Sequence, residues 1–293
     1  MIPRKQYSIP LRGRAPLELG KRTLIMGIIN VTPDSFADGG LRLDAARAVA
    51  DGLQMIDDGA HILDVGGEST RPGADPVSAE DELLRVLPVV EALAQDGRVP
   101  VSIDTYKSVV AREALARGAT IVNDVSGLQY DEGLAATVAA SGAALVLMHN
   151  RGRSREMYRD AAYDDVVGEI GRELEAAIGR ATAAGIPREL VIVDPGFGFA
   201  KRAEHTWESL AGLDRLAALD RPILVGPSRK SFLAAAFASG IGDWPPSERD
   251  WATAAAVTAS VLGGAHIVRV HAVREMADVV RVSDRLRAAA IRH

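Results

Sequence analysis

Residues 224–232 read Leu-Val-Gly-Pro-Ser-Arg-Lys-Ser-Phe, and the fold can be worked out from this stretch. An apolar run that begins at Ile223 has the length of a short buried strand, and Gly226 and Pro227 then turn the chain. The turn leads into two hydroxyls and two cations: Ser228, Arg229, Lys230 and Ser231. Such a set suits an anionic ligand, because Arg offers a fork of donors, Lys a point charge and a helix start free amides. A solvated helix start would explain one isolated cluster equally well.

Apolar runs of strand length recur along the chain, separated by segments with helical spacing. The eight runs lie at residues 24–29, 62–65, 99–103, 120–122, 144–148, 191–193, 223–225 and 267–270. Helical spacing is seen, for example, in Ala45, Val49, Leu53 and Ile56. Eight strands that each precede a helix predict a parallel sheet closed into a single (β/α)₈ (TIM) barrel. An open doubly wound sheet is less favoured, since no G-x-G-x-x-G motif follows the first strand.

We expect one barrel domain over residues 21–293, because no Ser/Pro-rich linker or composition shift divides the chain of 293 residues. Residues 1–20 read as a short lead-in. A hairpin is expected there, with a turn at residues 12–16 and these side chains facing one another: Tyr7, Ile9 and Leu11 on one arm, Leu17 and Leu19 on the other.

The composition limits the classes of function. Hydrophobic residues make up 47% of the chain and aromatic residues only 4%, so the core must be aliphatic. The net charge of −5 argues against nucleic-acid binding, which uses a basic face. The chain contains no cysteine, which removes disulfides, thiolate catalysis and Cys-ligated metals. We find no signal peptide and no run long enough to span a membrane, so a soluble cytoplasmic protein is expected.

Polar residues follow every apolar run, and in such a barrel the carboxyl ends of the strands form the active-site face. Each one alone could be a helix cap, but eight such strand ends together are hard to explain by capping. Asp104, Asn123 and Asp194 could read the edge of a flat heterocycle through paired hydrogen bonds. Phe199 and the guanidinium of Arg269 could sandwich such a ring.

An anionic group could be held at the same face. The candidates for a phosphate are Arg269, Lys230, Ser231 and His271. Asn30, with Asp34 or Asp38 nearby, offers oxygen ligands to Mg²⁺ on a diphosphate, since Mg²⁺ takes few protein ligands. No Ser-His-Asp order and no H-E-x-x-H motif is present, so nothing favours a hydrolase.

Taken in order, these motifs resemble the dihydropteroate synthases, the folate-pathway enzymes that sulfonamides inhibit. The resemblance runs from Leu24 to Arg281 and rests on residues 26–40, 64–74, 102–105, 123–127, 194–201, 226–232 and 269–271. It implies a (β/α)₈ barrel that condenses 6-hydroxymethyl-7,8-dihydropterin diphosphate with p-aminobenzoate, giving 7,8-dihydropteroate and pyrophosphate. It also implies a homodimer with the helices at residues 251–262 and 275–287 in the interface.

The resemblance assigns roles residue by residue. The pterin contacts would be Asp104, Asn123, Asp194 and Lys230, with Phe199 and Arg269 lining the ring. The diphosphate contacts would be Arg269, His271 and Ser231, with Mg²⁺ at Asn30 and with Gly226 in the binding motif. The p-aminobenzoate region would contain Thr70, Arg71, Pro72, Lys230 and Ser231. The catalytic set would be Asp38, Asp104, Lys230 and Arg269, with Asp38 or Asp104 stabilising positive charge on the pterin carbon as the diphosphate departs.

Two other readings remain open. A pterin-binding methyltransferase module would share the barrel, but it would not need the loop at residues 69–73 or the cluster at 228–231. A degenerate paralogue would bind pterin without turnover. The presence of Asp38, Arg71, Lys230 and Arg269 argues against it. Three positions depart from the family pattern, none of them in the catalytic set: Asn150, Thr206 and Ala272.

Overall fold

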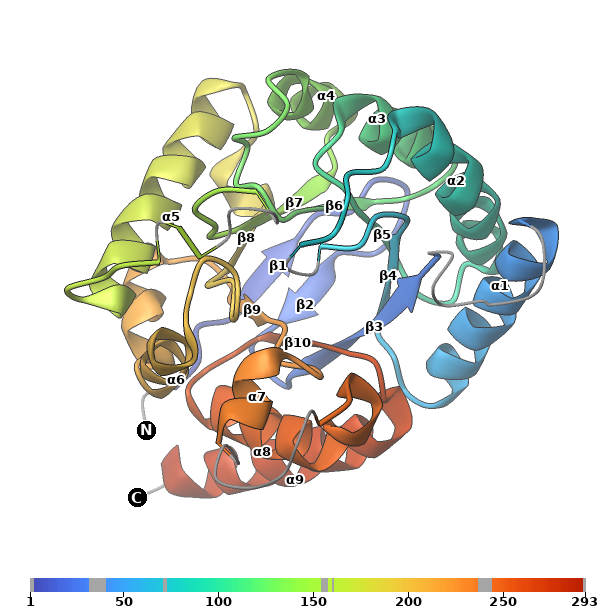
Figure 1. The fold of residues 1–293 in the computed structure, drawn as a ribbon. Coiled ribbons are helices and arrows are strands. Elements are labelled where there is room, and N and C mark those ends of the chain that lie inside the picture. Colours follow the sequence, from blue (N-terminus) through green and yellow to red (C-terminus); the bar gives the residue numbers. More distant parts are fainter. Residues whose placement is uncertain are drawn as a thin grey trace.

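The computed structural model describes residues 3–31, 41–70, 73–153, 158–159, 161–236 and 244–291. A ring of parallel strands lies at the centre and helices surround it (Figure 1). The strands are β3 (Leu24–Asn30), β4 (Ile62–Gly66), β5 (Val101–Asp104), β6 (Ile121–Asp124), β7 (Ala144–Met148), β8 (Val191–Asp194), β9 (Leu224–Val225) and β10 (Ile267–Val270). The prediction of a (β/α)₈ barrel is confirmed.

Helices follow the strands around the ring. They are α1 (Leu41–Asp57), α2 (Ala79–Asp96), α3 (Ser108–Ala116), α4 (Gly133–Ser141), α5 (Val166–Ala183), α6 (Ala203–Ala211), α7 (Ser231–Ala235), α8 (Asp250–Leu262) and α9 (Val273–Ile291), with 3₁₀ turns η3 (Arg188–Leu190), η4 (Leu213–Leu219) and η5 (Pro246–Glu248). The helix over Ala45 to Ile56 lies where the apolar spacing predicts it.

The strands run in the order β8-β7-β6-β5-β4-β3-β10-β9, and all neighbours are parallel. A parallel bridge between Val193 and Ile223 joins β8 to the chain just before β9 and so closes the ring. The predicted strand positions agree with the structure to within two residues. The run expected from Val99 begins as a strand only at Val101, because Pro100 has no N–H for a ladder bond and accepts one through its carbonyl from Leu63.

The core is aliphatic, as the composition predicts. Every residue of β4, β6, β7 and β8 is buried, because side chains of these strands face either the barrel interior or the surrounding helices. Gly52 on α1 shows how close the layers come: a Cβ there would lie 2.8 Å from Ile29 and 3.0 Å from Leu93. A larger residue would push α1 away from the sheet.

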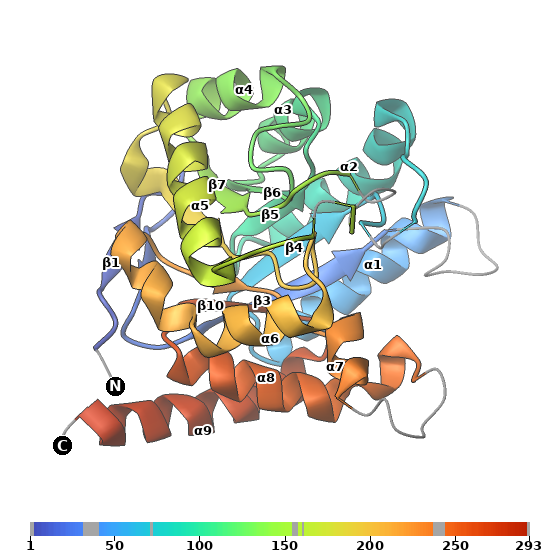
Figure 2. The ribbon, with the colours of Figure 1, turned by 60° about the vertical axis from the view of Figure 1, so that its left-hand side comes forward.

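The lead-in forms the predicted hairpin. β1 (Tyr7–Ile9) and β2 (Leu17–Leu19) pair antiparallel, with Tyr7 opposite Leu19 and Ile9 opposite Leu17. The hairpin lies across the end of the barrel at which the strands begin, since Lys5 O contacts Nε2 of His266, the residue just before β10. Figure 2 shows the hairpin and both termini on one side, with β3 pointing away from them. The opposite end is therefore left for the polar strand ends.

None of the helices in the described part of the chain is long and apolar enough to cross a membrane.

Candidate active site

An ion-pair network joins residues of four strands. Arg269 on β10 donates from Nε to Asp64 Oδ2 on β4 at 2.6 Å, and from Nη2 to Asp104 Oδ2 on β5 at 2.7 Å. Asn123 on β6 donates from Nδ2 to the same Asp64 oxygen at 2.9 Å. Asp64 is fully buried, and its Oδ2 accepts from both donors. Residues that lie up to 205 positions apart in the sequence thus form one charged cluster.

The register of the sheet aligns the polar strand ends. Asn30 pairs with Gly66, Gly66 with Asp104, and Asp104 with Asn123. A Cβ at Gly66 would lie 3.3 Å from the Cβ of Asp104 and 3.5 Å from its Oδ2. The absence of a side chain at Gly66 therefore leaves room for the Asp104 carboxylate between Asn30 and Asn123.

A second charged group lies at the ends of β8 and β9. Asp194 ends β8, and its Oδ1 accepts a hydrogen bond from Gly196 N at 2.7 Å. Lys230 donates from Nζ to Phe197 O at 2.6 Å and lies 3.7 Å from the centre of the Phe199 ring. Burial lowers the pKa of Lys230 to about 7, although the nearby Asp194 opposes that shift. Lys230 can therefore change its charge near neutral pH.

The two acids that face this space have raised pKa values. Burial raises the pKa of Asp104, with Arg269 acting in the opposite direction. Burial also raises the pKa of Asp194, and its hydrogen bond from Gly196 partly offsets this. Groups with shifted pKa values that gather at one end of a barrel are typical of a functional site.

Arg229 does not join this site, which corrects the reading of the 228–231 cluster as a pair of cations for one anion. Its guanidinium donates twice to Asp250 on α8, at 2.8 Å each, and its backbone N–H donates to Thr253. Arg229 has φ +59°, a left-handed conformation that turns its side chain and that of Lys230 in different directions. One cation holds the β9–α7 turn against α8, and the other remains for the site.

Ser228 holds His271. The backbone N–H of His271 donates to Ser228 Oγ at 3.2 Å, and the same hydroxyl lies 2.9 Å from His271 Nδ1. The hydroxyl can donate to Nδ1 while it accepts from the backbone, which leaves the proton of a neutral ring on Nε2. Of the four residues in the cluster, Ser228 therefore orients a histidine.

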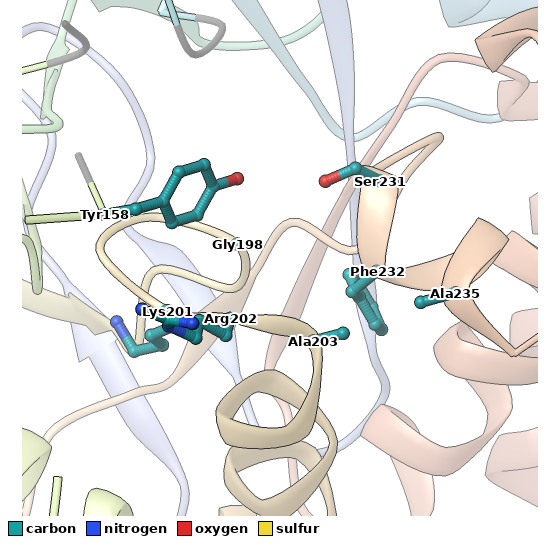
Figure 3. A pocket seen from close by; sticks show the side chains of 8 residues that line it. All are labelled: Tyr158, Gly198, Lys201, Arg202, Ala203, Ser231, Phe232 and Ala235. Atoms are coloured by element: carbon teal, nitrogen blue, oxygen red, sulfur yellow. The ribbon is translucent and has the colours of Figure 1, made fainter. Parts of the chain in front are cut away.

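A cavity of about 470 Å³ opens beside Ser231 at the start of α7. Figure 3 shows Tyr158 and Ser231 on opposite sides of the opening, with Lys201 and Arg202 next to each other at its base. The remaining lining residues are Gly198, Ala203, Phe232 and Ala235. Ser231 belongs to this opening, whereas Gly226 lies next to Arg269, whose Cβ would be 3.8 Å from a Cβ at that glycine.

Glu68 links the two ends of the loop between β4 and α2. Its Oε2 accepts from Val77 N at 3.3 Å and from Lys107 Nζ at 2.5 Å, and Tyr106 Oη donates to its Oε1 at 3.0 Å. Lys107 also pairs with the buried Glu82 of α2. The carboxylate of Glu68, two residues before Thr70, therefore joins the start of this loop to Val77 near its end and to the residues just before α3.

The remaining predicted residues lie on the loops and strand ends around this site or outside the described residues. Thr70 lies partly exposed after β4, and Asn30 ends β3 with an exposed side chain. Asp38, Arg71 and Pro72 lie outside the described residues.

Sequence reasoning assigned no role to Asp64, Glu68 or Lys201, although each follows or interrupts an apolar run. Asp64 had a usable signal, because a carboxylate inside the run Ile-Leu-Asp-Val must be buried and so needs a partner. Nothing local showed that the partner would be Arg269. Chemically, the site offers hydrogen-bond acceptors and donors at the strand ends, the cations Arg269 and Lys230, and the aromatic ring of Phe199.

Comparison with known proteins gives a consistent result. The family described as "Pterin binding enzyme" matches residues 26–271. A dihydropteroate synthase of Synechocystis is 44% identical over 275 residues, which cover 94% of this chain and 93% of the relative. The Yersinia pestis dihydropteroate synthase, solved with a sulfonamide drug, superposes with a TM-score of 0.88 at 39% identity and covers 96% of this chain and 99% of its own. The Xanthomonas albilineans enzyme, solved with 4-aminobenzoic acid, has a TM-score of 0.87 at 40% identity and covers 97% and 99%.

Proposed function

We infer the roles of these residues from the premise that the chain belongs to the dihydropteroate synthase family of pterin-binding enzymes. It is a transferase of folate biosynthesis and a member of the family that sulfonamides target. The reaction condenses 6-hydroxymethyl-7,8-dihydropterin diphosphate with p-aminobenzoate, giving 7,8-dihydropteroate and pyrophosphate. The observation that carries the residue roles is the network of Arg269 with Asp64 and Asp104, because it presents an acidic edge beside a cation.

The pterin ring is proposed to bind along Asp104, Asn123 and Asp194. Their carboxylates and amide offer acceptors and donors to the nitrogen edge of a flat heterocycle, and burial strengthens these hydrogen bonds. Lys230 and Phe199 would close the other side, since the ammonium already lies against the aromatic ring. Arg269 would line the ring while Asp64 holds its guanidinium.

The diphosphate is proposed to leave toward Arg269, His271 and Ser231. The bond from the pterin methylene carbon to the diphosphate oxygen breaks, and its electron pair leaves with the diphosphate. Asp104 would stabilise the positive charge that develops on the carbon, as would Asp38, which lies outside the described residues. The neutral amine of p-aminobenzoate then forms the C–N bond and loses one proton to solvent.

Mg²⁺ is part of this proposal. Asn30 ends β3 with an exposed amide, which suits a cation that takes few protein ligands and completes its shell with water and phosphate oxygens. The ion would supply charge neutralisation on the departing diphosphate.

The p-aminobenzoate is proposed to lie between Thr70, Lys230 and Ser231, together with Arg71 and Pro72, which are outside the described residues. Its carboxylate would face the exposed Ser231 hydroxyl at the start of α7, next to the open cavity. Because Gly226 has no side chain, it would leave space beside Arg269 for the substrates.

A homodimer is proposed through α8 and α9. Trp251 at the start of α8 is 88% exposed, and Val282 and Leu286 on α9 are 61% and 53% exposed, which are large apolar areas to leave in water. A cytoplasmic location is also proposed, in keeping with the composition.

The function is tested by pyrophosphate release from purified protein that is given the pterin diphosphate, Mg²⁺ and p-aminobenzoate, with each component omitted in turn. We expect release only when all three are present. Binding of the pterin diphosphate without release would point to a degenerate paralogue and contradict the proposal.

Asp104→Asn tests the site in the same assay. We expect pterin diphosphate affinity to fall about tenfold or more, because the substitution turns an acceptor into a donor and deprives Arg269 of a partner. Asp131→Asn is the control, since Asp131 accepts hydrogen bonds from the backbone amides of Ser108 and Gly133 at the start of other helices. Equal affinities of both variants would remove Asp104 from the pterin site.

A further inference from the structure

Lys201 is a buried cation with no role in the proposed chemistry. Its side chain is only 1% exposed. Its Nζ lies 2.8 Å from His149 Nδ1, 3.0 Å from Phe199 O and 3.2 Å from Gly196 O. Two of these three partners are carbonyls of the loop between β8 and α6, and the third is on the residue after β7.

The hydrogen-bond directions around Lys201 follow from its neighbours. His149 Nε2 lies 3.1 Å from a carboxylate oxygen of Glu173, which also binds Arg151. A carboxylate accepts, so Nε2 carries the ring proton and Nδ1 accepts from Lys201. Burial lowers the pKa of His149 to about 4, which keeps this neutral form at pH 7. The three acceptors thus match the three N–H donors of a lysine ammonium group. Burial lowers the pKa of Lys201, and the negative charge of Asp194 opposes that effect.

The loop that Lys201 contacts has an unfavourable backbone. Gly196, Gly198 and Ala200 have φ values of +67°, +74° and +48°, so every second residue is left-handed. For Ala200 this conformation costs free energy, because a Cβ is present. A Cβ at Gly196 would lie 2.1 Å from His149 O, so the loop also sits tightly against the end of β7. Such a conformation needs external contacts to hold it.

Two lysines and a tyrosine supply donors to this loop, and Thr206 Oγ1 accepts from Gly198 N at 3.3 Å. Lys201 binds the carbonyls of residues 196 and 199, whereas Lys230 binds the carbonyl of Phe197 and the ring of Phe199. Tyr163 donates from Oη to Ala200 O at 3.0 Å. The loop is therefore held by donors from inside the barrel wall and from the active site, and Phe199 is positioned between the two lysines.

We propose that Lys201 is a positioning residue for the condensation: it holds the 196–200 loop so that the Phe199 ring lies under Lys230. The proposal rests on the proposed function of this site. Lys201 acts through the main-chain carbonyls of Gly196 and Phe199, to which its Nζ donates. His149 at the end of β7 accepts from Lys201 and is itself held by Glu173. The end of β7 therefore also helps to position the 196–200 loop.

The test compares Lys201→Met, Phe199→Ala and the double variant by steady-state kinetics with both substrates. Lys201→Met keeps the length of the side chain and removes its donors. We expect kcat/KM for p-aminobenzoate to fall at least about tenfold in each single variant. The double variant should be close to Phe199→Ala alone, since the lysine acts through that ring. Losses that multiply, or an unchanged kcat/KM in Lys201→Met, would overturn the proposal.

Arg287→Met is the matched control. Arg287 is a 5% exposed cation that donates to the carbonyls of Val261 and Leu262, far from the strand ends. We expect it to lower the melting temperature while kcat/KM stays unchanged. Suppose that Lys201→Met and Arg287→Met lost the same stability and the same kcat/KM. The loss in Lys201→Met would then come from general destabilisation of the fold, and the proposal would fail.

Tyr163→Phe covers the case in which Lys201→Met does not fold. It removes one donor to the same loop, and we expect a smaller fall in kcat/KM in the same direction. No change would overturn the proposal. An inactive wild-type protein would refute the proposed function instead, so the two failures can be told apart.

Discussion

At the scale of single residues, the charge of Lys230 depends on the fold. It lies against Phe199 and bonds Phe197 O, and burial lowers its pKa from 10.5 to about 7. Asp194 and Asp104 favour its charged form, while Arg269 opposes it. At neutral pH the charged form of Lys230 can bind an acidic or electron-rich partner. Keeping that charge in a buried site lowers the free energy of unfolding of the protein.

Lys230→Met should therefore change how stability depends on pH. In wild type, between pH 7 and 10.5, the unfolded chain keeps a proton on Lys230 that the folded chain has lost, so the free energy of unfolding rises with pH in this window. The variant lacks this rise. We expect the variant to be the more stable protein at pH 6.5, and its advantage to shrink by at least about 1 kcal/mol by pH 9.5.

Urea unfolding at pH 6.5, 8 and 9.5 measures this difference. Turnover of Lys230→Met should fall at every pH, because the cation on the active-site face is lost. A stability difference that stays constant with pH would show that Lys230 keeps its ordinary pKa in the folded protein.

At the scale of elements, the loop between β4 and α2 illustrates how one side chain shapes a segment. Glu68 binds Val77 N near the far end of the loop, and Lys107 and Tyr106 from the start of α3 bind Glu68. Ser78 then caps α2 by accepting from Asp81 N at 3.0 Å. The strand, the loop and two helix starts are tied together at one carboxylate.

Glu68→Gln should raise the KM for p-aminobenzoate several-fold. The amide cannot accept from Val77, Tyr106 and Lys107 at once, so the loop that carries Thr70 loses its shape. Affinity for the pterin diphosphate should change little, because Asp104 and Asn123 lie on other strands. Steady-state kinetics with each substrate varied measures both.

Glu80→Gln is the control for Glu68→Gln, since Glu80 is exposed in the first turn of α2. The idea is wrong if the two variants have the same KM for p-aminobenzoate.

At the scale of the whole molecule, the N-terminal segment is tied to the last helix. Arg4 donates from Nη2 to Asp284 Oδ1 at 2.6 Å and from Nη1 to Ala265 O at 2.6 Å. Thr23 N donates to Asp284 Oδ2 at 2.7 Å. The side chains of Arg4 and Asp284 are only 6% and 19% exposed. One carboxylate of α9 thus joins the lead-in, the start of β3 and the C-terminal helix.

Asp284→Asn should destabilise the protein by about 3 kcal/mol, because it leaves a buried Arg4 without its counter-charge. Catalysis at 25 °C should be unchanged, since this contact lies at the end of the barrel opposite the polar strand ends. Chemical unfolding and steady-state kinetics check the two parts. Asp278→Asn on the same helix removes an exposed pair and should cost less than about 1 kcal/mol. Equal costs for both variants would contradict this account.

Much of the fold could be predicted from the sequence. The apolar runs located all eight strands, and the hairpin register followed from the facing residues of its two arms. Strand ends were less certain: β9 has only two residues, because Pro222 interrupts its beginning and Gly226 and Pro227 follow it. In the site, the sequence pointed to Asp104, Asn123, Asp194 and Lys230 as strand-end residues, and the structure places them at one end of the barrel.

By itself the sequence determined the number and order of the strands and the polar character of their carboxyl ends, because periodicity and short connections are local properties of the chain. Only the tertiary structure decided which charges meet. Arg269 pairs with Asp64 and Asp104, Arg229 turns away to Asp250, and Lys201 supports the loop of Phe199. These pairings depend on the stagger of the strands and on left-handed loop residues, which bring together side chains that are distant in the sequence and carry no local signal of one another.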